Sequence, residues 1–81
     1  MIYPVQVRAA RGLLGMGQEE LAALASISVV TLKRFEAAGI EIRGTASTLT
    51  RLQRALESAG IVFIEQNGSQ GPGVRLRDPL P

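Results

Sequence analysis

The spacing of apolar residues divides this chain of 81 residues into two parts at Gly60. Before Gly60, aliphatic residues recur every three or four positions, which is the period of a helix with one buried face. After it, the extended segments IVFIE and VRLR flank the glycine-rich stretch NGSQGPG, as two strands joined by a turn do. The pattern therefore predicts a mainly α fold, with a helical domain at 1–60, a C-terminal β-hairpin at 61–77 and a frayed tail at 78–81.

Capping residues divide the first part into four helices. Pro4 suits the first turn of a helix, because the N–H that proline lacks would have no partner there. Gly17 and Ser28 are favourable N-caps for a second and a third helix, and Thr45 or Ser47 can cap a fourth. Glycines end the first, third and fourth helices, and Gly60 is the expected C-cap of the fourth. With two Phe and one Tyr, the core must be aliphatic, which favours packed helices.

The composition excludes several kinds of site. Without cysteine there is no disulfide, thiolate metal site or thiol nucleophile, and without histidine the commonest metal ligand and general base are missing. The carboxylates are scattered without a paired arrangement. We therefore expect no enzyme, no metal site and no cofactor. The longest clean apolar run, 61–64, is too short to cross a bilayer, and the N-terminus lacks a signal-peptide pattern, so we expect a cytoplasmic protein without a membrane partner.

The third helical segment, SVVTLKRFE, mixes cations and apolar residues on one face. At about 100° per residue, Leu32 and Phe35 fall on the side that faces the core. The opposite side, which we call the outward stripe, consists of Val30, Lys33, Arg34 and Ala37. The major groove of DNA suits this chemistry, because thymine presents a methyl group, guanine accepts hydrogen bonds from arginine, and phosphates line both rims. The stripe could instead contact a partner protein or a later segment of the chain, with its cations solvated.

The order of these segments resembles a known family. RGLLGMG followed by QEELAALASISVVTLKRFEAAG is similar to the helix-turn-helix domain of the phage-repressor-like (Cro/XRE-type) regulators. The shared features are Gln at the start of the second helix, Leu-Ala one turn later, a tight turn, and a third helix of the form Ser-x-x-Thr-aliphatic-x-Arg-aromatic-Glu. A leucine-rich helix follows a loop. The resemblance covers roughly residues 4–59 and implies a third helix in the major groove, with the second crossing the phosphates.

The resemblance also implies DNA contacts from three parts of the chain. Gln18 would bind a phosphate at the N-terminus of the second helix, where N–H groups attract anions. Arg43, in the loop before the fourth helix, would reach the DNA backbone or the minor groove, and Ser28 and Thr31 would contact phosphates. The third helix would face base edges or the adjacent backbone through Val29, Val30, Lys33 and Arg34.

The resemblance implies one further contact, and the chain departs from the family pattern at two places. Arg11 and Glu36 match a pair that joins the first helix to the third, so we expect a structural salt bridge between them. Ser26 occupies a turn position where many relatives have glycine. Val29 and Val30 stand where many have Gln, Ser or Arg, so specificity would depend on the cations of the outward stripe and on indirect readout of DNA shape.

Residues 61–77 lie outside the resemblance. An isolated two-stranded hairpin is marginal in water and its edges invite pairing, so one prediction is that it completes a sheet across a two-fold axis with a second subunit. The alternative is that the hairpin packs on the helices of its own chain. NGSQGPG lacks the Lys-Ser/Thr of a P-loop and precedes a strand, which favours a turn.

Together these features predict a sequence-specific DNA-binding transcriptional regulator, a repressor, that binds a pseudo-palindromic operator in double-stranded DNA as a homodimer. The net charge of +2 agrees with such a partner but is a weak indication by itself. An alternative function is that of an antitoxin or anti-activator, which would bind a protein partner through the hairpin or through Val29 and Val30. The other helix cations, Arg8, Arg51 and Arg54, are interpreted as solvated charges.

Overall fold

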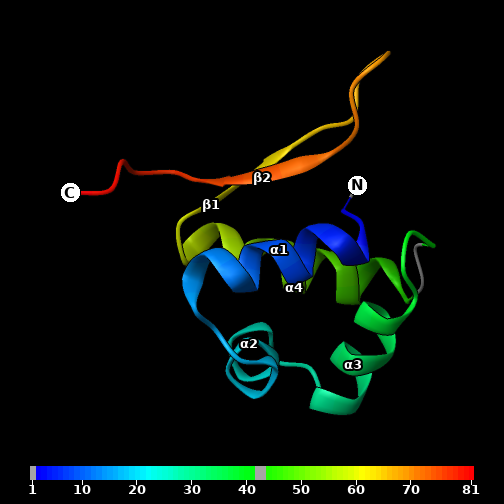
Figure 1. Ribbon diagram of the computed structural model, residues 1–81. Coiled ribbons are helices and arrows are strands. Elements are labelled where there is room, and N and C mark those ends of the chain that lie inside the picture. Colours follow the sequence, from blue (N-terminus) through cyan, green and yellow to red (C-terminus); the bar gives the residue numbers. More distant parts are fainter. Residues whose placement is uncertain (1, 42–43) are drawn as a thin grey trace.

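The structure, a computed structural model, describes residues 2–41 and 44–81. The described elements are α1 (Pro4–Leu14), α2 (Gln18–Ala25), α3 (Val29–Ala37), α4 (Ala46–Ser58), β1 (Ile61–Ile64) and β2 (Gly73–Leu76). The antiparallel hairpin of β1 and β2 lies across α1 and α4, and α2 and α3 lie on the opposite side of that helix pair (Figure 1). The mainly α fold followed by a β-hairpin, predicted from the apolar spacing, is confirmed.

The helix ends follow the capping residues closely. Pro4 stands in the first turn of α1, and Ser28 caps α3 by accepting a hydrogen bond from the N–H of Thr31. Of the two candidates for α4, Thr45 is the N-cap. The C-cap of α4 is Ala59 rather than the predicted Gly60, which follows it with a φ of 106°.

The turn between α2 and α3 has the same backbone as the end of α1 but a different residue at its centre. Ser26 has a φ of 57° and a ψ of 44°. Among residues 2–41 and 44–81, it is the only residue other than glycine with a positive φ. Its N–H donates to the carbonyl of Ala23, and the N–H of Ile27 donates to that of Ala22, which together form a Schellman motif. Gly15 has the corresponding position after α1, at a φ of 63°. Glycine adopts this conformation without strain, whereas serine does not.

The core is mainly aliphatic and draws on all four described helices, on β1 and on Ile2, which lies two residues before α1. Phe35 is its one aromatic member among the buried hydrophobic residues of the described chain. The buried hydrophobic residues are Ile2, Val7, Ala10, Leu21, Ala22, Ala25, Leu32, Phe35, Leu52, Leu56 and Ile61.

The hairpin packs on the helices of its own chain, with β2 against α1 and β1 against α4. Ile61 lies opposite Leu76 and Phe63 opposite Val74, and these side chains pack against the core. Gln6 of α1 is 3% exposed and donates its side-chain amide to two strand carbonyls. Of the two predicted arrangements, packing on the same chain is therefore present. It covers one face of the hairpin.

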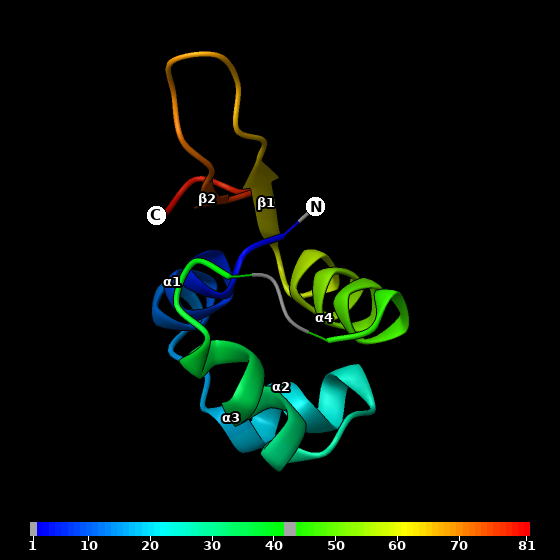
Figure 2. The same cartoon turned by 90° about the vertical axis from the view of Figure 1, so that its right-hand side faces the viewer.

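The ends of the strands differ by one residue from the prediction. The first strand ends at Ile64, one residue before the end of IVFIE, and the second begins at Gly73 rather than Val74. Between them, Asn67 and Gln70 pair as an isolated bridge around a tight turn. The connecting segment extends away from the helices (Figure 2). Residues 78–81, predicted as a tail, lie outside the helices and strands.

Candidate nucleic-acid interface

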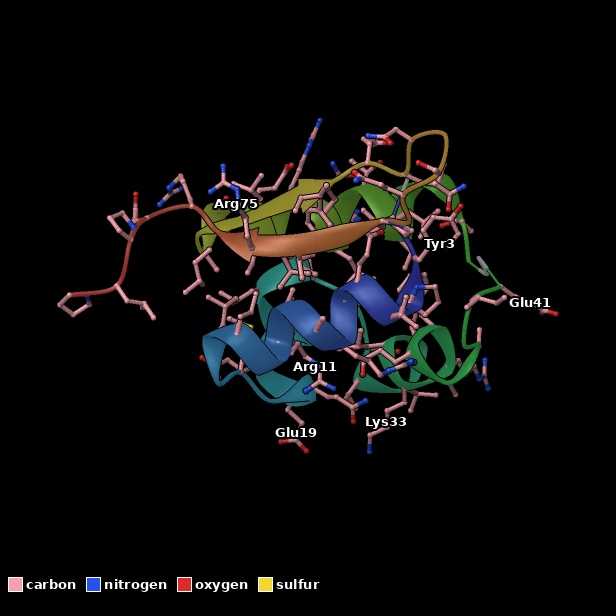
Figure 3. All side chains as sticks on the ribbon, turned by 45° about the horizontal axis from the view of Figure 1, so that its top comes forward. Tyr3, Arg11, Glu19, Lys33, Glu41 and Arg75 are labelled. Atoms are coloured by element: carbon pink, nitrogen blue, oxygen red, sulfur yellow. The ribbon has the colours of Figure 1, made fainter. Side chains whose placement is uncertain are left out.

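The outward stripe of α3 faces away from the core, as its helical spacing predicts. Val30 is 54% exposed, and the other three stripe residues are also exposed. Leu32 and Phe35, on the opposite side of α3, are buried. The Lys33 side chain extends away from the helices (Figure 3). The stripe is therefore accessible to a partner.

The first turn of α3 is tied together by two hydroxyl groups. The Oγ of Ser28 accepts a hydrogen bond from the N–H of Thr31 at 3.0 Å and donates one to the Thr31 Oγ1 at 2.8 Å. Ser28 is exposed and Thr31 half-buried. Val29 is half-buried and packs against the core, so it presents less of its surface than Val30 does. The hydroxyl pair stabilises the N-terminus of α3 because it satisfies an N–H that has no partner within the helix.

A buried carboxylate joins α3 to both preceding helices. Glu36 is 3% exposed. Its two oxygens accept hydrogen bonds from the Nε and Nη2 of Arg11, each at 2.7 Å, so the predicted pair forms a bidentate salt bridge. Arg11 also donates its Nη1 to the carbonyl of Met16, in the connection between α1 and α2. The position of α3 is therefore fixed against α1 and the start of α2.

The charge of Arg11 is stabilised by this arrangement. The pKa of its guanidinium is raised above the ordinary value. The hydrogen bond to Glu36 is the main cause; partial burial acts in the opposite direction, and the charge of Glu36 adds to the increase.

Gln18 belongs to the same cluster. Its Nε2 donates to the Glu36 Oε1 at 2.9 Å, so the amide that the resemblance assigns to a phosphate bonds inside the protein. Gln18 remains half-buried and is the first residue of α2. No local sequence pattern indicates this link, because it joins residues 18 positions apart.

Two arginines interpreted as solvated make tertiary hydrogen bonds. Arg8 donates its Nη1 to the backbone carbonyl of Glu36, near the C-terminus of α3. Arg51 of α4 donates its Nη1 to the carbonyl of Ser26, in the turn before α3, at 3.2 Å. The sequence could have indicated the Arg8 contact. Arg8 lies one turn before Arg11 and so shares the face of α1 that approaches α3.

Two depressions adjoin the outward stripe. One, of about 460 Å³, lies between α1, the start of α2 and α3. The other, of about 670 Å³, lies between α3 and the start of α4. Arg43, which the resemblance assigns to the DNA backbone or the minor groove, lies outside the described residues. The residues of the first depression are Arg8, Arg11, Gln18, Lys33, Glu36 and Ala37, and we call it the basin.

Within residues 2–41 and 44–81, no three or more acidic side chains come together in a group that could hold a metal ion. None of the helices described there is long and apolar enough to span a bilayer. Comparison with known proteins gives no match, either to a protein-family model or to a curated protein.

Proposed function

We propose that this protein is a sequence-specific DNA-binding transcriptional regulator that inserts α3 into the major groove. The observation that carries the proposal is the exposed outward stripe, an apolar centre between two cations on a helix whose other face is buried. Arg34 has the donor geometry that recognises the O6 and N7 of guanine, and Val30 suits a thymine methyl group. Lys33 adds a charge for the phosphate rim.

The anchoring of α3 supports this function energetically. Glu36 holds α3 to Arg11 of α1 and to Gln18 of α2 through hydrogen bonds within the protein. A recognition element that is already ordered loses less conformational entropy when it binds. A rigid α3 therefore suits a surface that must align several side chains with base edges at once.

The proposed active species is a homodimer formed through the hairpin. Antiparallel partners share a face of the sheet, so Val62, Arg75 and Ile64 lie on the face opposite the helices. Ile64 is 44% exposed. A second hairpin paired edge to edge across a two-fold axis would extend this sheet, bring the two copies of its apolar residues side by side and present two copies of α3. Half-sites in the operator would then lie about one helical turn, roughly 34 Å, apart. Such a dimer would repress by occupying a promoter.

The decisive experiment is selection of bound sequences from a random DNA pool, followed by affinity measurements on the selected site. We expect Arg34→Ala to weaken binding by about 1–3 kcal/mol and to relax the preference at one base pair. Arg54→Ala on α4, which removes a cation far from the stripe in sequence, is the matched control. Equal losses on selected and random DNA would contradict the assigned role of Arg34.

Different results would contradict the proposed function and the proposed dimer. A wild-type protein without salt-dependent affinity for any DNA would contradict the regulator and favour the alternative of a protein-binding antitoxin or anti-activator. Sedimentation as a monomer at micromolar concentration would contradict the hairpin dimer alone.

A further inference from the structure

We propose that the basin seats one phosphate of the DNA backbone, held by Arg8 and Lys33. This inference rests on the proposed function and adds Arg8, to which the resemblance assigns no DNA contact. The basin adjoins the outward stripe, because Lys33 and Ala37 belong to both. When α3 enters the major groove, a phosphate on the rim of that groove therefore comes next to the basin.

The charges of the basin are not balanced. Three cations and one carboxylate line it. Both oxygens of the carboxylate, on Glu36, bond to Arg11, and Gln18 adds a further hydrogen bond to one of them. The acid thus neutralises Arg11 from a buried position, and the positive charges of Arg8 and Lys33 are left exposed. The acidic residues Glu19 and Glu20, which follow Gln18 in α2, do not line the basin.

The guanidinium of Arg8 is held in place for this contact. Its hydrogen bond to the backbone carbonyl of Glu36 places the cation at the C-terminal end of α3, where the helix dipole favours a positive charge. A guanidinium carries several N–H donors in a planar fork, so this bond leaves others for a phosphate oxygen. The N-terminus of α2 also adjoins the basin through Gln18, and its partial positive charge favours an anion.

In this proposal Gln18 has a different role from the one that the resemblance assigns. Its amide N–H₂ bonds to Glu36 and supports the floor of the basin. Arg8, one turn before Arg11 on α1, supplies the charge that meets the phosphate. Gln18 is therefore a positioning residue here.

The test is the salt dependence of DNA affinity. Arg8→Gln removes the charge but keeps an N–H donor for the Glu36 carbonyl. We expect the slope of log affinity against log salt to fall by about one unit, on selected and random DNA alike, without a change in sequence preference. Between 50 and 200 mM salt, the wild type should then lose about three- to fourfold more affinity than the variant.

Three matched variants separate the phosphate contact from a structural role. Arg54→Gln removes the same charge from α4 and should leave the slope unchanged. Arg8→Lys restores a charge at the basin and should restore the slope. Lys33→Gln changes an exposed side chain and should also lower the slope, and this can be measured even if Arg8→Gln does not fold.

Each outcome decides the proposal. If the wild type binds DNA and either Arg8→Gln or Lys33→Gln leaves the slope unchanged, the phosphate seat is wrong while the regulator stands. If the wild type shows no salt-dependent affinity for DNA, both fail. A lower slope in these two variants, with an unchanged slope in Arg54→Gln, establishes the seat.

Discussion

Two buried polar side chains, one on each side of the molecule, hold its elements together in different ways. Glu36 and Gln6 are each 3% exposed. Glu36 is charged and joins α3 to side chains of α1 and α2. Gln6 is neutral and joins α1 to backbone carbonyls of the hairpin, at 2.9 Å to Gly73 and 3.4 Å to Ile64. Its own carbonyl oxygen accepts the N–H of Tyr3.

The difference shows what each region requires. A side-chain ion pair fixes helices at one position, because a bidentate guanidinium and carboxylate match in one geometry. An amide that bonds to backbone carbonyls holds a strand pair whatever side chains the strands carry. The charged anchor therefore lies where α3 must be oriented, and the neutral anchor lies where the hairpin needs only to be attached. Disrupting the first should also cost more, because it leaves a buried charge.

The largest expected effect is the removal of Arg11. Arg11→Met leaves the buried carboxylate of Glu36 without its ion-pair partner. It should therefore lower the free energy of unfolding by about 3–5 kcal/mol, measured by urea denaturation. The double variant Arg11→Met/Glu36→Met should lose less than the single variant, because no unpaired charge remains. Arg54→Met is the surface control. If the double variant were less stable than Arg11→Met, the contrast between the charged and neutral anchors would be wrong.

The charged anchor should not weaken at alkaline pH. The pKa of Arg11 is raised in the folded protein. A cation of this kind stabilises the fold below its unfolded-state pKa and loses that effect only as the pH rises through the folded-state value. The loss caused by Arg11→Met should therefore be the same at pH 7 and pH 9, within about 0.5 kcal/mol. A clear decrease of that loss by pH 9 would mean that the guanidinium is not the stabilising group.

The neutral anchor should produce a smaller loss with a local signature. Gln6→Ala leaves strand carbonyls without their side-chain donor and should cost about 1–3 kcal/mol. Amide hydrogen exchange in β1 and β2 should accelerate more than exchange in α2 and α3. Gln6→Met, which keeps the volume but not the hydrogen bonds, separates packing from polarity. Uniform acceleration across the chain would show that Gln6 supports the whole core and not the attachment of the hairpin.

The smallest expected effect has the opposite sign and concerns the turn before α3. Ser26 has a positive φ, so Ser26→Gly should stabilise the protein by about 1 kcal/mol in thermal or urea unfolding. The Arg51 hydrogen bond is retained, because it goes to the backbone carbonyl. Ser28→Ala, two residues later, should instead cost about 1 kcal/mol by removing the N-cap. If both changes destabilised, strain at Ser26 would be excluded.

Much of the helical region could be predicted from local patterns. Ser28 and Thr45 cap helices because a short hydroxyl side chain reaches the N–H three residues ahead, and that reach depends only on nearby residues. The outward stripe follows from 100° per residue in the same way. The salt bridge of Arg11 and Glu36 came from the resemblance, since the two residues lie 25 positions apart. No pattern in the sequence indicated the hydrogen-bond partners of Gln6 and Gln18.

The sequence by itself determined the order of the helices and the hairpin, which face of α3 packs on the core, and the absence of cysteine and histidine, because periodicity and caps act over a few residues and composition needs no fold. Only the tertiary structure decided that the hairpin packs on α1 and α4, that Gln18 bonds to Glu36, and that Arg8 reaches the end of α3. A polar side chain long enough to reach several partners has no preferred one until the helices pack. Packing then places the carbonyls and carboxylates that must be satisfied once they are buried.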